Sequence, residues 1–193
     1  MKIIAATSNK GKIREIKKIF SEFEIISMKE AGIDIEIEEN GKTFEENALI
    51  KARTVAKLTN SIALSDDSGL CVDALSGAPG IYSARYAGEN ATDEERVKKL
   101  LSVLENEENR TAKFISAVAL VYPDGKELTA LGEVFGKIGY SPSGENGFGY
   151  DPVFISDELG KTFADASDDE KNSISHRKRA LSNLYEKMIK GEK

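Results

Sequence analysis

The chain has 193 residues, of which 40% are hydrophobic and 31% are charged, and its formal net charge at pH 7 is −6. This length and composition are typical of one globular domain with a sizeable core, and the negative charge argues against general binding to nucleic acid or to an anionic membrane. The single cysteine, Cys71, excludes an internal disulfide framework and suits a reducing cytoplasm. We expect neither a secretory signal nor a membrane span.

The first part of the chain alternates between predicted strands and predicted helices. A helix is expected after the turn at 8–11, because Ile13, Ile16 and Phe20 recur on one helical face. A second helix is expected after Thr43, which forms a capping box with Glu46. Strands are expected at residues 2–7, 24–28, 33–37 (where I-D-I-E-I alternates) and 62–65.

The second part of the chain contains a long predicted hairpin. A capping box at Thr92 and Glu95 predicts a helix before it, and residues 111–122 and 126–138 are expected to pair around Pro-Asp-Gly. The last helix is expected to begin near Ser173 or Ser175. Glycine-rich loops are expected at 77–88 and 139–151, with a short strand at 153–155.

The order of these elements indicates the α/β class. Early strand–helix units followed by a long hairpin favour a mixed β-sheet flanked by helices. The sequence has no linker rich in proline, serine or charge. We therefore expect residues 1–193 to form a single domain of two lobes that share one sheet.

Two pairs of adjacent acids are the strongest indication of a functional site. Asp66 and Asp67 follow an apolar I-A-L stretch, and buried carboxylates are costly unless they are paired, hydrogen-bonded or bound to a metal. The alternative is an ordinary D-D-S-G surface turn. Glu38 and Glu39 stand near the end of another expected strand, and carboxylates that converge at strand ends would hold Mg²⁺ shared with substrate phosphates. Consecutive strand residues point to opposite faces, so Asp66 and Asp67 should have different roles.

The segment T-S-N-K-G-K at 7–12 lies between an expected strand and an expected helix. A helix N-terminus beside lysines suits phosphate, although a simple helix cap with solvated lysines is the alternative. The spacing differs from that of a P-loop.

Two later segments suit a nucleobase. Gly147 and Gly149 flank Phe148, which leaves that ring open to stacking with a purine, unless the segment is only a tight loop. Lys171 to Arg177 contains His176, the only histidine, and its donors suit a base with a 6-keto oxygen. A structural role for this histidine is the alternative.

Taken together, these segments resemble the inosine/xanthosine triphosphate pyrophosphatase family, also called Ham1-like or RdgB-like. The resemblance covers nearly the whole chain. It implies an elongated mixed α/β fold with a substrate cleft between two lobes, usually as a homodimer. It also implies Mg²⁺-dependent hydrolysis of ITP, dITP and XTP to the monophosphate and pyrophosphate. The matching stretches, in order, are residues 7–12, 38–48, 65–70, 77–86, 147–152 and 174–177.

The resemblance also implies residue roles. Asp67 would accept a proton from the water that attacks the α-phosphorus. Metal ligands would come from Glu38, Glu39, Asp66 and Asp67. Substrate would be bound by Thr7, Ser8, Asn9, Lys10, Gly11, Lys12, Ser68, Phe148, Gly149, Tyr150, Asp151, Lys171, His176 and Arg177.

Two other functions remain open. One is a house-cleaning hydrolase of other modified nucleotides, and the other is a nucleotide-binding regulatory protein without turnover. We expect neither nucleic acid nor membrane among the partners.

Overall fold

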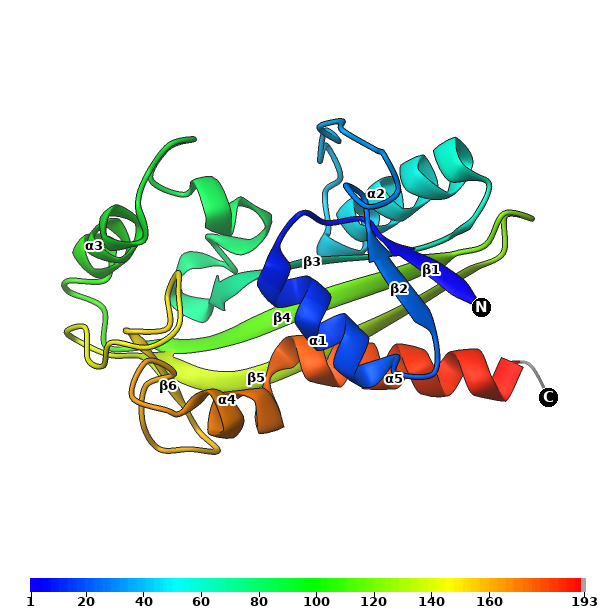
Figure 1. The fold of residues 1–193 in the computed structure, drawn as a ribbon. Helices are drawn as coiled ribbons and strands as arrows, with labels where there is room; N and C mark the ends of the chain where they lie inside the picture. Colours follow the sequence, from blue (N-terminus) through cyan, green and yellow to red (C-terminus); the bar gives the residue numbers. More distant parts are fainter. Residues whose placement is uncertain (192–193) are drawn as a thin grey trace. The chain divides into compact units, whose positions relative to one another are not determined.

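The computed structural model describes residues 1–191, and the chain divides into two compact units (Figure 1). Unit 1 comprises Met1–Asp67, Ser116–Gly132 and Arg177–Lys193, and unit 2 comprises Ser68–Ile115 and Glu133–His176. Six strands form one sheet in the order β2-β1-β3-β4-β5-β6, with both parallel and antiparallel pairs. The predicted mixed sheet with helices is therefore confirmed.

Unit 1 begins with two strand–helix units. Strand β1 (Lys2–Ala5) pairs in parallel with β2 (Glu24–Ser27) on one side and with β3 (Ile62–Val72) on the other. Helices α1 (Lys10–Ile19) and α2 (Phe44–Thr59) connect them, as parallel pairing requires. Because β1 and β3 are parallel, the carboxyl end of β1 lies beside Leu64 of β3. The polar segment 7–12 follows β1 at this point, and Asp66 and Asp67 follow Leu64 along β3.

Helices cover both faces of the unit 1 sheet. Helices α1 and α5 (His176–Gly191) lie on one side of β1 and α2 lies on the other (Figure 1). Strand residues alternate between these two faces, because successive side chains point in opposite directions. The first face packs Ile3, Ala5, Leu64, Ile16, Phe20, Leu181 and Leu184, and the second packs Ile4, Ala63, Ala48, Ala52, Val55 and Ala56.

Helix starts in unit 1 follow their caps. The Asn9 carboxamide oxygen accepts hydrogen bonds from the Gly11 and Lys12 amides, at 2.8 and 3.2 Å. The Thr43 hydroxyl accepts from the Glu46 amide at 3.1 Å, as predicted. In a full capping box the Glu46 carboxylate would accept a hydrogen bond from the amide of Thr43. Here it accepts from the amide of Lys42, one residue earlier, at 2.6 Å.

Unit 2 is organised around aromatic rings. Phe114 of β4 (Thr111–Val121) contacts Phe154 of β6 (Phe154–Ser156) and Phe163, with ring centroids 4.6 and 5.8 Å apart. Strand β5 (Glu127–Ile138) completes the predicted hairpin. The predicted capping box opens α3 (Asp93–Val103). The remaining elements are the short helices η1 (Asp73–Leu75), η2 (Gly80–Arg85) and α4 (Asp168–Ile174), of which α4 was not predicted.

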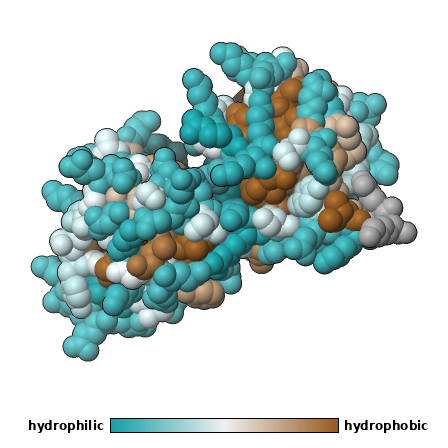
Figure 2. Space-filling model, turned by 60° about the horizontal axis from the view of Figure 1, so that its bottom comes forward, coloured by the Kyte–Doolittle hydropathy of each residue, from teal (hydrophilic) through white to brown (hydrophobic). Residues whose placement is uncertain are grey.

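The face of the molecule drawn in Figure 2 is largely polar. On the face shown in Figure 2, hydrophilic residues predominate and hydrophobic ones form small separate areas. Among residues 1–191, no helix is long and apolar enough to cross a membrane.

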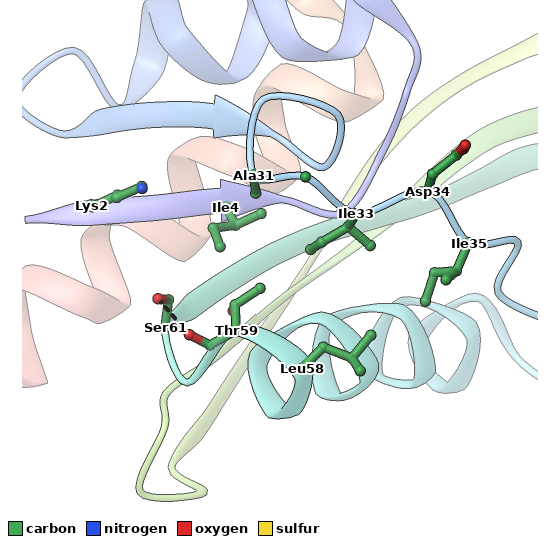
Figure 3. Close-up of a pocket in the computed structure, with 10 residues that line it drawn as sticks. Lys2, Ile4, Ala31, Ile33, Asp34, Ile35, Leu58, Thr59 and Ser61 are labelled. Atoms are coloured by element: carbon green, nitrogen blue, oxygen red, sulfur yellow. Dashed lines mark hydrogen bonds between the residues drawn. The ribbon is translucent and has the colours of Figure 1, made fainter.

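The predicted strand at 33–37 is wrong, because this segment is irregular. Its alternation has a different cause. Ile33 and Ile35 point toward α2 in a pocket of about 640 Å³, and Asp34 points away from it (Figure 3). Ile33 and Ile37 also pack against the core on the α2 face. The alternation of apolar residues here reflects a position beside a helix rather than strand pairing, and Ile35 remains 45% exposed.

Candidate active site

The acidic pair lies inside a strand. Strand β3 runs without interruption to Val72, so both the expectation that it ends at residue 65 and the turn alternative are wrong. Asp66 and Asp67 contact different helices, because consecutive strand residues face opposite ways. Asp66 lies with Lys12 of α1, and Asp67 lies with Asn47 of α2. The prediction that the two acids serve different roles agrees with this arrangement.

Asp66 is the centre of a buried charge network. Its Oδ2 lies 3.0 Å from Lys12 Nζ and 3.0 Å from Arg177 Nε, and Arg177 Nη1 lies 3.3 Å from Glu15 Oε1. Burial alone would raise the pKa of Asp66, but the charges of Lys12, Arg177 and Lys51 outweigh it and hold that pKa far below its ordinary value. Asp66 is therefore ionised, and its Oδ1 is buried with no hydrogen-bond partner among residues 1–191.

Asp67 has a weaker set of partners. Its Oδ2 accepts a hydrogen bond from Asn47 Nδ2 at 3.0 Å, and its Oδ1 lies 3.9 Å from Lys51 Nζ. Lys51 Nζ is closer to Glu39 Oε1, at 3.1 Å. Burial raises the pKa of Asp67, and the nearby charge of Glu39 raises it further, against the opposing effects of Lys51, Asn47 and Lys12. A carboxylate with a raised pKa is a stronger base than an ordinary aspartate.

Several of these groups line one pocket of unit 1, with a volume of about 730 Å³. This volume is in the usual range for small-molecule sites. Glu38 is exposed and does not line the pocket, whereas Glu39 does. The polar and charged side chains in its lining are Thr7, Ser8, Lys12, Lys29, Asp34, Glu36, Glu39, Lys51 and Asp66.

The N-terminus of α1 is partly satisfied by its own cap. Asn9 accepts from the amides of Gly11 and Lys12, and the Thr7 hydroxyl accepts from the Asn9 amide at 3.2 Å. Two of the free amides that the sequence suggested for a phosphate are thus already hydrogen-bonded. Of the predicted 7–12 segment, the pocket is lined by Thr7, Ser8 and Lys12.

The carboxylates fit a divalent cation shared with a ligand. Among residues 1–191, no group of three or more histidine, cysteine, aspartate or glutamate side chains could hold a metal alone. Mg²⁺, however, is commonly bound by one or two carboxylates together with substrate phosphates and water. The charge of Glu39 helps to raise the pKa of Asp67, and Asp66 Oδ1 has no hydrogen-bond partner among residues 1–191, so these acids can accept further positive charge.

The second predicted group lies in unit 2. Asp151 is buried, and its Oδ2 accepts from the Phe148 amide (2.8 Å) and from Lys171 Nζ (2.5 Å). Lys171 Nζ also lies 4.7 Å from the centroid of the Phe148 ring. That ring is 61% exposed, so one of the largest aromatic surfaces of unit 2 is open to a ligand.

Glycine is required in this loop. Gly147 has φ of +80°, and a Cβ there would lie 2.1 Å from Asp151 Oδ2. The amide of Gly149 donates to Asp93 Oδ2 at 2.6 Å. Tyr150 is buried and its hydroxyl donates to the Ser83 carbonyl at 2.9 Å, while burial raises its pKa. Tyr150 thus anchors the loop, and Phe148 is the ring that it exposes.

His176 and Arg177 are adjacent in sequence but belong to different units. In unit 2, the His176 ring stacks on Phe114, with centroids 5.0 Å apart and planes at 12°. In unit 1, Arg177 is held by Asp66 and Glu15. Ser68 is the first unit 2 residue after Asp67, on the same strand.

Two buried polar residues of α2 were missed by the sequence analysis. Asn47 and Lys51 lie one helical turn apart, next to the apolar stripe that includes Ala48 and Ala52. The sequence did contain a signal for Lys51, which stands next to Ala52 of the apolar stripe. Lysine is rarely buried without a partner, so a lysine at this position indicates a buried ion pair.

The chain is similar over nearly its whole length to proteins of one known family. The model of the Ham1 family matches residues 3–187. A dITP/XTP pyrophosphatase of Staphylococcus aureus strain Mu50 is 46% identical over 191 residues, 99% of this chain and 97% of that protein. One from Geobacter sulfurreducens is 52% identical over 187 residues, 95% and 94% of the two chains.

Solved structures share the fold of this chain. The Staphylococcus aureus Ham1 protein superposes with a TM-score of 0.93 at 46% identity, covering 100% of both chains. A HAM1 protein from Coxiella burnetii gives a TM-score of 0.93 at 42% identity, covering 98% of this chain and 99% of that one. The chain belongs to the Ham1 family.

Proposed function

We propose that this protein hydrolyses dITP, XTP and ITP to the nucleoside monophosphate and pyrophosphate in the presence of Mg²⁺, which removes noncanonical purine nucleotides from the pool. The observation that carries the proposal is the pair Asp66–Asp67, in which one acid is fixed by cations and the other has a raised pKa. The family relatives named as dITP/XTP pyrophosphatases support the same reaction.

The triphosphate is assigned to the pocket of unit 1. Lys12 and Lys51 supply positive charge there, and Thr7 and Ser8 supply hydroxyl groups. These groups suit phosphate oxygens, which accept hydrogen bonds and carry negative charge. The rest of the predicted segment, Asn9 to Gly11, contributes by shaping the start of α1.

Glu39 and Asp67 are assigned to Mg²⁺, with Asp66 and Glu38 as the other acids of the set. When bound, the ion would neutralise phosphate charge and polarise the phosphoryl group. Asp66 keeps Lys12 in place at 3.0 Å, and Glu38 lies exposed beside Glu39.

Asp67 is assigned the role of general base. Its carboxylate takes a proton from a water whose oxygen attacks the α-phosphorus, and the bond from that phosphorus to the bridging oxygen breaks to release pyrophosphate. The raised pKa of Asp67 favours proton transfer, and a general base typically contributes about 10²–10⁴-fold to the rate.

Unit 2 is assigned the base and sugar. Phe148 offers an exposed ring for stacking, and Lys171 lies over that ring. Donors suit the 6-keto oxygen shared by hypoxanthine and xanthine, where adenine carries an amino group. The other residues assigned to the substrate are Ser68, Gly149, Tyr150, Asp151 and His176 of unit 2, and Arg177 of unit 1.

The test is pyrophosphate release from ITP, XTP, dITP, ATP, GTP and CTP, with Mg²⁺ or with chelator. Mg²⁺-dependent release confined to ITP, XTP and dITP supports the proposal. Release of orthophosphate would move the attack to a terminal phosphorus, and preference for another nucleotide would favour a different house-cleaning hydrolase. Binding of dITP without turnover would leave a regulatory protein.

We further propose that residues 1–193 act as one catalytic domain, as a homodimer in the cytoplasm. The family resemblance supports the dimer, and the single Cys71 suits a reducing compartment. Light scattering after size-exclusion chromatography gives the mass, which should be twice that of a 21.1 kDa chain.

A further inference from the structure

We propose that Asn47 is a positioning residue that holds the Asp67 carboxylate and the turn bearing Glu39 in a single geometry. This inference rests on the proposed function, because it concerns the base and the metal-binding acids of that reaction. Asn47 itself touches neither substrate nor metal in this proposal. It acts through the two carboxylates.

Both ends of the Asn47 carboxamide are engaged. Its Oδ1 accepts a hydrogen bond from the Gly41 amide at 2.8 Å, and its Nδ2 donates to Asp67 Oδ2 at 3.0 Å. The orientation of the amide follows from its partners, because a backbone N–H can only donate and an ionised carboxylate can only accept. The carboxamide is planar, so fixing one end also fixes the other.

Burial makes this bridge rigid. Asn47 is 1% exposed and lies in the second turn of α2, which is packed through Ala48 and Ala52 into the core. A buried amide that lost one partner would leave a polar group unsatisfied, at a cost of about 1–3 kcal/mol. The side chain therefore has a strong preference for the arrangement that satisfies Gly41 and Asp67 together.

The turn is built closely around this side chain. A Cβ on Gly41 would lie 2.7 Å from Asn47 Oδ1, so the backbone approaches the amide at a distance that only glycine permits. Glu39 lies two residues before Gly41 and contacts Lys51, one helical turn after Asn47. Both contacts between the turn and α2 continue to Asp67: Asn47 donates a hydrogen bond to its Oδ2 at 3.0 Å, and Lys51 Nζ lies at the longer distance of 3.9 Å from its Oδ1.

The Asn47 bridge determines the orientation of the Asp67 carboxylate, the proposed general base. With Oδ2 engaged by Asn47, the other oxygen of Asp67 faces Lys51 at 3.9 Å. Rotation of the carboxylate would move the oxygen that accepts the proton. Misplacement of a reacting group by about 1 Å can cost about 10²-fold in rate.

Asn47→Asp is the informative variant. It keeps the shape and the acceptor for Gly41, but it replaces the donor toward Asp67 with a second carboxylate oxygen. We expect kcat for dITP to fall by about 10–100-fold while KM changes by less than about 3-fold, because binding groups are untouched. The matched control is Asn183→Asp, in which the exposed amide that donates to the Leu131 carbonyl at 2.9 Å receives the same change.

A second readout separates positioning from simple stabilisation. Hydrogen exchange of the Gly41 amide should stay slow in Asn47→Asp and become fast in Asn47→Leu, which lacks the acceptor. Activity should be low in both. If Asn47→Asp fails to fold, Asn47→Ser, which leaves a small gap instead of a charge, takes its place with the same expected kcat loss.

The outcomes can be told apart. A folded Asn47→Asp or Asn47→Ser protein with kcat within about 2-fold of wild type would overturn the inference. A wild-type protein that releases no pyrophosphate would overturn the proposed function. The exchange rate of Gly41 would still report on the Asn47 bridge in that case.

Discussion

Replacement of Arg177 by methionine should destabilise unit 1 through Asp66. The substitution keeps an apolar stem but removes the guanidinium, which is 5% exposed and contacts Asp66 and Glu15. Removing one partner of a buried ion pair costs about 3–5 kcal/mol. Lys12 remains 3.0 Å from Asp66, so we expect the lower end, about 3 kcal/mol. For a chain of this length, that corresponds to a fall in Tm of about 6–12 °C.

Urea unfolding of four proteins forms the assay: wild type, Arg177→Met, Asp66→Asn and the double variant. The double variant should lose less than the sum of the single changes, because the uncompensated buried charge is gone. Additive losses, or a loss below about 1 kcal/mol for Arg177→Met, would refute the reasoning.

The same pair predicts a pH dependence. The folded-state pKa of Asp66 lies far below its ordinary value of 3.8, so its stabilising contribution is present above that value and is lost as the pH falls toward the folded pKa. The difference in unfolding free energy between wild type and Arg177→Met should be constant between about pH 6 and pH 8 and shrink below about pH 4. A difference that grows on acidification would contradict this assignment.

Three further changes test other parts of the site. Asp67→Asn should reduce kcat by about 10²–10⁴-fold, because it removes the proposed base. The Tm should stay unchanged or rise, because the substitution removes a buried charge whose pKa is raised. Near-normal turnover in the folded protein would exclude Asp67 as the base. Phe148→Ala should raise KM for dITP by about 5–100-fold through lost stacking. The control Phe135→Ala, at a residue that is 51% exposed, should leave KM unchanged. Equal effects of the two substitutions would contradict a base-stacking role for Phe148. Gly147→Ala should lower the unfolding free energy by about 1–3 kcal/mol more than Gly125→Ala. Both glycines have positive φ, but only at Gly147 would the added Cβ meet a carboxylate oxygen, at 2.1 Å. Equal losses measured by calorimetry would contradict this packing argument.

Local chemistry in the sequence predicted much of the fold. The cap at Thr43 and the full capping box at Thr92 mark the starts of α2 and α3 correctly. The hairpin around Pro-Asp-Gly was found because its turn residues and flanking apolar runs are local signals. Helix α4 was missed, although Ser167 and Glu170 form a capping box, because only seven residues follow with little apolar periodicity.

The other errors concern features that depend on distant residues. Asp66 can lie inside β3 because Lys12 and Arg177 neutralise it, and no window around residue 66 contains either of them. In the predicted strand at 33–37, Ile33 and Ile37 pack against the core, but Ile35 is exposed and the segment does not pair with another strand. Asn47 shows its role only when Gly41 and Asp67 are brought to it.

The placement of two acids at consecutive positions of β3 makes strand register a chemical constraint. Ile62 to Leu64 pair with Ile3 to Ala5, which fixes the side of the sheet that each later β3 residue faces. A slip by one residue would turn Asp67 toward α1 and α5, and Asp66 toward α2. The anchored carboxylate and the reactive one would exchange surroundings. Selection on catalysis therefore also selects for correct pairing of β1 with β3, so misfolded registers of this sheet are inactive as well as poorly packed.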